Sequence, residues 1–257
     1  MTPPFDLSGR RALVTGIANA ESIATGCAAA FRAAGARVAA SYQTPAARPH
    51  VAEVADRLGL EWLQPLDVRR DDELEALFAE VDQRWGGLDI LLHSIAFAPK
   101  ADLHGRVVDC SAAGFAEAMD ISCHSFIRMA RLAEPRMTAG GCLLTVTYEG
   151  AGRVVPHYNM MGPVKAALES VMRCLACELG AAGIRVHALS PGPIPTRAAR
   201  GLDQFEELRA DAARRAPIQA PVTIDDVGAV AVLLASDAGR HMTGTLIPID
   251  GGAHLRA

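Results

Sequence analysis

Short apolar runs alternate with helical patterns along the chain, and this alternation restricts the fold more than any other feature. The apolar runs occupy residues 11–15, 37–41, 61–66, 88–93, 142–147, 185–189 and 245–249. The helical patterns lie over 22–34, 50–59, 71–85, 114–137, 165–179 and 223–236. Strands that are apolar throughout are buried on both faces. The pattern therefore predicts an α/β fold, a Rossmann-type doubly wound parallel sheet of about seven strands with helices on both faces.

The bulk properties of the sequence fit one domain over residues 1–257 and exclude several classes of partner. Half of the 257 residues are hydrophobic, which is enough for a sizeable core. A net charge of -4 gives no electrostatic footprint for nucleic acid or for an anionic membrane. Neither a secretory signal nor a membrane span is visible. We therefore expect a cytoplasmic protein without nucleic-acid or membrane partners.

Six scattered cysteines are expected to be reduced thiols, because nothing in the sequence indicates export. Cys174 and Cys177 form a CxxC pair inside a helical pattern. A zinc site would need a second pair or a histidine cluster, and neither accompanies it. We expect the pair to pack in the core, and we predict no metal site.

The predicted strands end in residues that suit ligand binding. Right-handed crossovers bring the carboxyl ends of parallel strands to one rim, where such folds bind ligands. Gly16, Asp67, Ser94, Tyr148 and Pro191 each follow a strand. We therefore expect these five residues to gather at one rim, although they are far apart in the sequence.

The first of these turns suits a nucleotide. From Gly16 to Ser22 and Ile23 it exposes N–H groups at a helix N-terminus, where a pyrophosphate binds. A GxGxxG series is absent, and a tight turn without a ligand would look the same. Asp67 and Val68 suit an adenine edge, and the small residues from Ser94 to Ala96 suit a cofactor lying against the backbone. Alternatively, Asp67 caps a helix and the turn at Ser94 serves only packing.

The residues after the second strand favour NADH over NADPH. A 2′-phosphate would need an arginine or lysine at 41–44, and the closest basic residue is Arg48, beyond Pro45. There is also no Asp or Glu to bind a ribose 2′-hydroxyl. Gln43 is expected to lie near the adenosine.

The segment from Tyr148 through Tyr158 to Lys165 carries the candidate catalytic groups. A free phenol has a pKa of roughly 10, and a nearby ammonium favours the phenolate. Paired at the rim, these groups would stabilise negative charge on a carbonyl or enolate oxygen. The alternative is a buried tyrosine and a surface lysine.

As a whole the chain resembles the FabI-type enoyl-[acyl-carrier-protein] reductases, a divergent branch of the short-chain dehydrogenase/reductase family. The likeness runs nearly end to end, through TGIANAESIATG, SYQ, HSIAFAP, SPGPIPTRAA, PVTIDDVG and IDGG. The most specific part is the spacing of Tyr158 and Lys165, which six residues separate. The common short-chain dehydrogenase spacing is Tyr-x-x-x-Lys.

The resemblance implies hydride transfer from NADH to the β-carbon of a trans-2-enoyl thioester on acyl carrier protein, a step of fatty-acid biosynthesis. It implies that Tyr158 donates a hydrogen bond to the enolate oxygen, that Lys165 binds the nicotinamide ribose and that Tyr148 lines the pocket. A homotetramer and a substrate-binding loop at about 196–216 are implied as well. The implied cofactor residues are Gly16, Ser22, Ile23, Gln43, Asp67, Val68, Ser94, Ile95, Ala96, Lys165, Ile194 and Thr196, and the implied substrate residues are Ala98, Tyr148, Tyr158, Met161, Ala198, Leu202 and Phe205.

Two departures from the family pattern lie inside the catalytic segment. Glu149 replaces the usual leucine after Tyr148, and we expect its carboxylate to face solvent. Pro163 lies two residues before Lys165. Proline is tolerated in a first helical turn, so Lys165 should keep its place.

A third departure concerns the partner. The substrate loop carries Asp203, Glu206 and Glu207 where many relatives are basic, and acidic residues should slow the encounter with an acidic carrier protein. Arginines elsewhere in the loop are the alternative source of positive charge, namely Arg197, Arg200, Arg209, Arg214 and Arg215. A reductase of an enoyl-CoA or of a specialised carrier-bound intermediate, and a non-catalytic nucleotide-binding protein, remain alternative functions.

Overall fold

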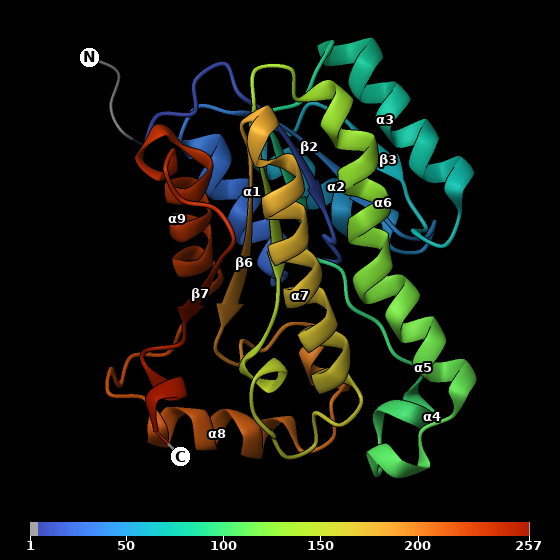
Figure 1. The fold of residues 1–257 in the computed structure, drawn as a ribbon, viewed down its shortest axis with the longest axis vertical. Coiled ribbons are helices and arrows are strands. Elements are labelled where there is room, and N and C mark those ends of the chain that lie inside the picture. The colour runs from blue at the N-terminus through green and yellow to red at the C-terminus, as the bar shows by residue number, and fades with distance from the viewer. Residues whose placement is uncertain (1–4, 257) are drawn as a thin grey trace.

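The computed structural model describes residues 5–256 and contains one seven-stranded sheet, parallel throughout (Figure 1). The strand order is β3-β2-β1-β4-β5-β6-β7. This confirms the predicted Rossmann-type doubly wound architecture. The strands are β1 (Arg11–Thr15), β2 (Arg37–Tyr42), β3 (Leu63–Pro65), β4 (Ile90–His93), β5 (Gly141–Val146), β6 (Ile184–Pro191) and β7 (Thr245–Ile249).

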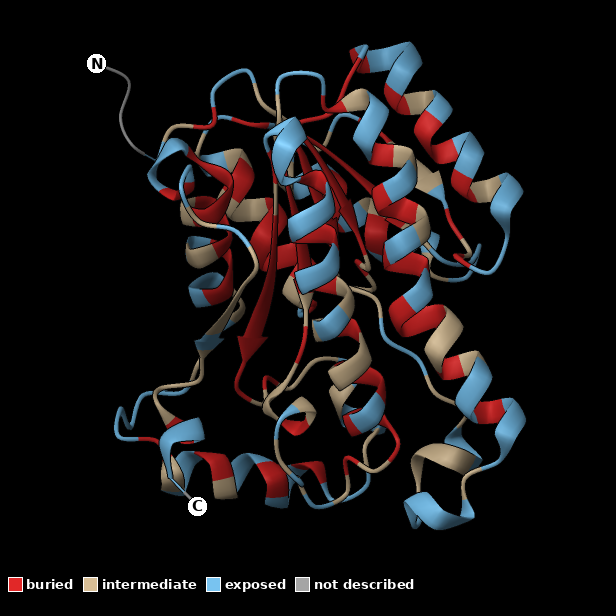
Figure 2. Ribbon diagram, viewed as in Figure 1, coloured by how far each residue is buried: buried red, intermediate tan, exposed pale blue. Residues whose placement is uncertain are grey.

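Helices cover both faces of the sheet and bury its central strands, whereas the edge strands β3 and β7 are only partly buried (Figure 2). Successive residues of one strand point to opposite faces. Thus Leu143 belongs to the core under α3, α6 and α7, whereas Leu144 belongs to the core under α1, α2 and α9. The helices are α1 (Ile23–Ala33), α2 (Arg48–Leu58), α3 (Asp71–Trp85), α4 (Lys100–Leu103), α5 (Ala112–Met119), α6 (Ser125–Ala133), α7 (Met161–Leu179), α8 (Phe205–Arg215) and α9 (Ile224–Ala235).

Glycines allow α1 and α9 to lie in close contact. A Cβ atom on Gly26 would collide with the Ile224 backbone, and one on Gly228 would lie 2.6 Å from the Gly26 carbonyl oxygen. A capping box begins α9, since the Thr223 side chain and the Asp226 carboxylate each accept a hydrogen bond from the other's backbone N–H. These contacts place the start of α9 beside the first turns of α1.

The single long helix predicted over 114–137 is wrong in detail. The chain instead forms α5, a π-helical turn at Asp120–His124, and α6. Inside the wider turn, Ser122 Oγ accepts from the Phe97 N–H at 2.9 Å and donates to the Phe97 carbonyl at 3.0 Å. The break therefore ties this helix to the loop after β4, and such π turns are frequent at functional sites. The spacing of apolar residues in the sequence does not reveal this π-helical turn.

The CxxC pair does not pack in the core, contrary to the prediction. Cys174 and Cys177 are both exposed and free. The buried stripe of α7 runs through Leu168, Met172, Leu175 and Leu179, and the two cysteines lie on the other side of the helix. All six cysteines are free thiols. Within residues 5–256 there is no group of His, Cys, Asp or Glu side chains suited to a metal ion, and no helix is long and apolar enough to cross a membrane.

Candidate active site

The turns after β1 and β4 meet through Gly16. This glycine has a φ of 98°, and a Cβ atom there would collide with the Ser94 backbone. The Ser94 N–H also donates to the Thr15 carbonyl at 3.2 Å. A bare backbone is therefore required where these turns touch, which brings together two of the predicted cofactor segments.

Ser22 shapes the turn between β1 and α1. Its buried Oγ accepts from the N–H groups of Ala18 and Asn19, at 3.0 and 3.1 Å. Ile23 begins α1, whose first turn contains no acidic residue. The positive end of the helix dipole therefore faces the rim without an acidic side chain beside it in that turn, which suits a pyrophosphate.

The predicted adenosine contacts lie after β2 and β3. Gln43 is exposed, Val68 is buried, and the Asp67 N–H donates to Glu73 at 2.7 Å. The Asp67 carboxylate pairs with Arg69 at 2.6 Å. Hydrogen bonds from Arg69 lower the pKa of Asp67, so this carboxylate is ionised at neutral pH. Sequence reasoning did not predict Arg69 as its partner.

The residues after β6 form the other wall of the rim. Ile194 is buried, and its carbonyl accepts from the Thr196 N–H at 2.7 Å. Arg200 Nη1 donates to Glu21 at 2.8 Å, which joins the substrate loop to the turn after β1. Figure 1 shows α8, the last part of this loop, across the end of the molecule to which the β6 and β7 arrows point.

Lys165 lies in the first turns of α7 and is buried at 5% exposure. Its Nζ donates to the Val146 carbonyl at the end of β5, at 2.7 Å. Burial lowers the pKa of Lys165 to about 8. Pro163 is the third residue of α7, so the expectation that this helix tolerates it is confirmed. The alternative of a surface lysine is excluded.

The rings of Tyr148 and Tyr158 meet edge to face, with centroids 4.9 Å apart. Burial raises the pKa of both phenols above the ordinary value, with smaller contributions from Glu149 at Tyr148 and from Tyr148 at Tyr158. The predicted shift toward the phenolate is therefore wrong in direction, because desolvation dominates. Tyr158 is a neutral hydrogen-bond donor at pH 7.

An apolar cluster surrounds Tyr158. Asn159 connects it to α4, because its Nδ2 donates to the Leu103 carbonyl at 2.8 Å. Five of the seven predicted substrate residues belong to this cluster, whereas Ala198 is exposed and Phe205 lies outside it. Leu103 and Met160 also belong to this cluster. The sequence did not predict them, because only their contacts in the fold reveal that they are members. Its members are Ala98, Leu103, Cys110, Ala118, Met119, Tyr148, Val155, Tyr158, Met160, Met161, Val164 and Leu202.

Glu149 does not face solvent, so that expectation is wrong. Its side chain is only 9% exposed, and Oε1 lies 2.6 Å from Nη2 of Arg215, the last residue of α8. The second oxygen lies 3.3 Å from Arg215 Nη1. A guanidinium supplied from 66 residues along the chain draws the carboxylate inward.

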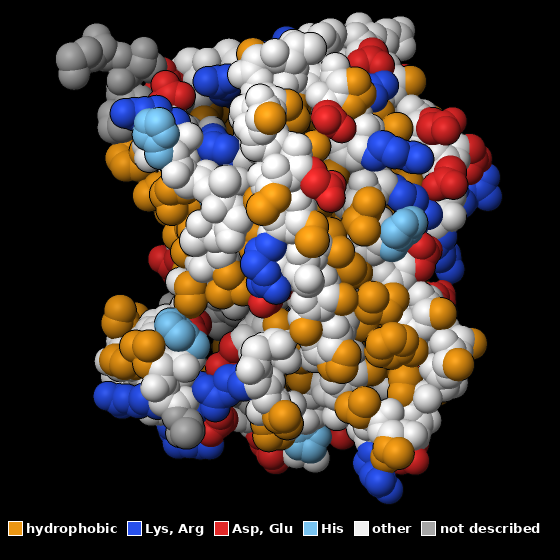
Figure 3. Space-filling model, in the orientation of Figure 1, with side chains coloured by type: hydrophobic (Ala, Val, Ile, Leu, Met, Phe, Trp, Pro, Cys, Tyr) orange, Lys and Arg blue, Asp and Glu red, His pale blue; other side chains and the backbone are white. Residues whose placement is uncertain are grey.

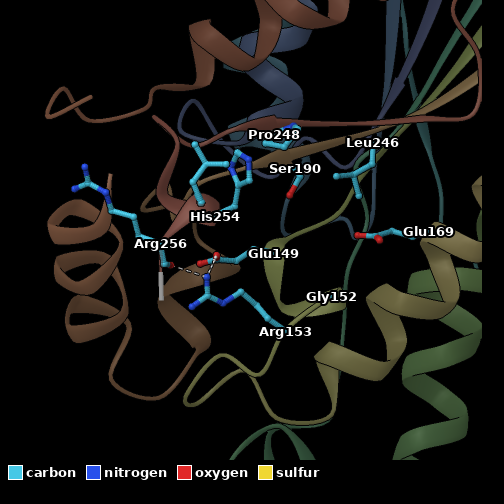
Figure 4. Close-up of a pocket in the computed structure, with 10 residues that line it drawn as sticks. Glu149, Gly152, Arg153, Glu169, Ser190, Leu246, Pro248, His254 and Arg256 are labelled. Atoms are coloured by element: carbon cyan, nitrogen blue, oxygen red, sulfur yellow. Dashed lines mark hydrogen bonds and ion pairs between the residues drawn. The ribbon is translucent and has the colours of Figure 1, made fainter. Parts of the chain in front are cut away.

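A cavity of about 480 Å³ lies beyond Glu149, along the strand ends of β6 and β7 (Figure 4). Figure 4 shows Arg153 between Glu149 and Arg256. Neither tyrosine of the candidate site lines this cavity, so it lies apart from the apolar cluster. The lining residues are Glu149, Gly152, Arg153, Glu169, Ser190, Leu246, Pro248, His254, Leu255 and Arg256.

The sequence matches a family model described as "Enoyl-(Acyl carrier protein) reductase" over residues 16–254. It is 43% identical to the NADH enoyl-[acyl-carrier-protein] reductase FabI of Aquifex aeolicus, over 97% of this chain and 93% of that protein. It is 41% identical to FabI of Escherichia coli, over 98% of this chain and 96% of that protein.

Solved structures agree with the sequence matches. An Anaplasma phagocytophilum enoyl-(acyl-carrier-protein) reductase in complex with NAD superposes with a TM-score of 0.93 at 41% identity, covering 97% of this chain and 95% of that one. A Bacillus cereus enoyl-acyl carrier protein reductase with NADP+ and an indole naphthyridinone gives 0.95 at 42% identity, covering 98% of each chain. The chain therefore belongs to the enoyl-[acyl-carrier-protein] reductase family.

Proposed function

We propose that this protein uses NADH to reduce a trans-2-enoyl thioester carried by acyl carrier protein. The observation that carries the proposal is the contact between the buried ring of Tyr158 and the partly buried ring of Tyr148, within an apolar cluster at the rim that also holds Lys165. An apolar wall suits an acyl chain, and a phenol at its edge suits the thioester oxygen.

In this proposal Tyr158 donates its hydrogen bond to the oxygen on which the enolate develops. A donor that is already in place, in a site from which water is excluded, stabilises that charge without reorganisation. Tyr158 keeps its proton at neutral pH because burial raises its pKa. Tyr148 packs against this ring and forms the substrate wall beside it.

The rim fits a nicotinamide dinucleotide. The absence of a side chain at Gly16 and the start of α1 suit the pyrophosphate. In this proposal Lys165, whose Nζ donates to the Val146 carbonyl, binds the ribose hydroxyls. The bound nicotinamide supplies the hydride. No basic residue occupies 41–44, and exposed Arg48 begins α2, which favours NADH over NADPH.

A homotetramer in the cytoplasm is part of the same proposal. Phe115 on α5 and Ile127 on α6 are large apolar side chains that are 38% and 36% exposed. Figure 3 shows hydrophobic side chains grouped over this part of the surface. Strand β7 ends the sheet with one edge unpaired by the other described strands. These surfaces suit contact with further copies, which light scattering after size-exclusion chromatography tests.

The charge of the substrate loop weighs against docking of an acidic carrier protein, and a reductase of an enoyl-CoA is therefore the second candidate. Asp203, Glu206 and Glu207 are exposed. Arg209 pairs with Glu206 at 3.0 Å, and Arg215 is inside the protein. Arg200 and Arg214 are paired as well, and within residues 5–256 only exposed Arg197 of the loop arginines has no ion pair, so the loop presents little unpaired positive charge to an acidic carrier protein.

The test follows NADH oxidation with crotonyl-ACP and crotonyl-CoA in parallel, and repeats both with NADPH. The proposal expects turnover of crotonyl-ACP with NADH and a lower kcat/KM in each of the other combinations. A strong preference for the CoA ester would favour the second candidate. No turnover of either ester would reject both enzymes and leave the non-catalytic alternative.

A further inference from the structure

The ion pair between Glu149 and Arg215 is largely buried. The two side chains are 9% and 10% exposed, and both carboxylate oxygens face the guanidinium. A planar guanidinium matches a carboxylate through two hydrogen bonds, which fixes both groups. The pair joins the segment after β5 to the last residue of α8.

Arg215 is fixed from further directions. Its Nε donates to Asp211 at 2.9 Å, and Nη1 donates to the Ala253 carbonyl at 2.6 Å. Glu149 has a second, weaker cationic neighbour, since Arg153 Nη1 lies 3.6 Å from Oε2 and is more exposed. Arg215 is therefore the principal partner of this carboxylate, and α8 determines where it lies.

Glu149 adjoins the reaction site. Its Oε1 atom lies 3.4 Å from the Tyr148 hydroxyl, which donates to it, and Tyr148 contacts Tyr158 ring to ring. An uncompensated carboxylate at this place would oppose the growth of negative charge on an enolate, and the effect would be strong in a buried environment. With its charge compensated, the same carboxylate accepts from the Tyr148 hydroxyl without that opposition.

We propose that Arg215 is a positioning residue that neutralises Glu149 beside Tyr148, so that α8 must be in place for efficient enolate formation. The inference rests on the proposed function, because it needs a reaction in which negative charge develops at Tyr158. It assigns to one arginine of the substrate loop a role in kcat and not only in substrate binding.

The test compares Arg215→Met, Glu149→Gln and the double variant E149Q/R215M, with kcat and KM measured on the thioester that the wild type turns over. R215M leaves the carboxylate without its principal partner, and kcat is expected to fall about tenfold or more, ~1.4 kcal/mol in the barrier. E149Q is expected to stay within about threefold of wild type, and E149Q/R215M to recover to about that level. If the ion pair had only a structural role, E149Q would lower kcat about as much as R215M. E149Q/R215M would not recover, because the double variant still lacks the pair.

Arg215→Lys keeps the result decisive if R215M does not fold. Lysine retains the charge but loses the two-pronged contact, so kcat stays near wild type under an electrostatic role and falls under a purely geometric one. Arg84→Met is the matched control, because it removes an exposed Arg–Glu pair of α3 remote from the rim. An inactive wild type would reject the proposed function. An active wild type with an unaffected R215M, or no recovery in E149Q/R215M, would reject this inference alone.

Discussion

Gly150 lies directly against the ring of Tyr158. A Cβ atom on Gly150 would come within 2.9 Å of the Tyr158 Cε1 atom and closer still to Cδ1. Both residues are buried. Gly150 also touches the start of α7, because a Cβ atom on Gly162 would lie 3.0 Å from its carbonyl oxygen. The position of the Tyr158 phenol thus requires a glycine, which has no side chain, at residue 150.

Gly150→Ala should therefore displace the Tyr158 ring. Overpacking of this kind costs about 1–3 kcal/mol of folding free energy, and kcat should fall at least about tenfold because the phenol leaves its place. Chemical denaturation and steady-state kinetics measure the two effects. Gly152→Ala is the control, since a Cβ atom there meets nothing within 4 Å. Equal behaviour of the two variants would contradict the packing argument.

Tyr158→Phe removes the hydroxyl but keeps the ring. Loss of an oxyanion donor typically costs ~2.7–4 kcal/mol of transition-state stabilisation, so kcat should fall by about two to three orders of magnitude while the melting temperature changes little. A rate within a few-fold of wild type would show that this phenol does not stabilise the enolate.

The affinity for NADH should depend on the protonation of Lys165. The pKa of this buried lysine is lowered to about 8, so its ammonium form predominates below that pH and is lost above it. If the ammonium binds the ribose hydroxyls, Kd for NADH should be flat below pH ~8 and rise by about tenfold per pH unit above it. Fluorescence titration of NADH measures this. Lys165→Met should bind weakly at every pH, and a wild-type Kd that stays flat across this range would contradict the role.

Replacing the acids of the substrate loop should separate carrier recognition from chemistry. The triple variant D203K/E206K/E207K reverses three exposed charges. We expect kcat/KM on crotonyl-ACP to rise by about tenfold at low salt and the gain to shrink as salt screens it. A neutral crotonyl N-acetylcysteamine thioester is the control substrate and should be unaffected. A similar gain on that thioester would show that the loop acts on catalysis and not on docking.

Residue types and their local order were enough to predict the sheet. The runs 11–15 and 245–249 are mainly apolar and match β1 and β7 in their bounds. Parallel pairing then brings Gly16 and Ser94 to one edge whatever the detailed packing. Tyr158 and Lys165 could be singled out because their spacing matches the enoyl reductases. The roles given to these residues remain predictions.

The tertiary structure decided what each side chain meets. The Glu149 side chain points inward because it pairs with Arg215 at the end of α8. Cys174 is exposed because it does not belong to the buried stripe of α7. Likewise, the pKa of Tyr158 rises because burial outweighs any nearby positive charge. Local sequence determines secondary structure here through the continuous apolar runs of buried strands and the 3.6-residue period of helices. Partners distant in the chain determine the burial and charge of a side chain, so the state of Glu149 followed only from the fold.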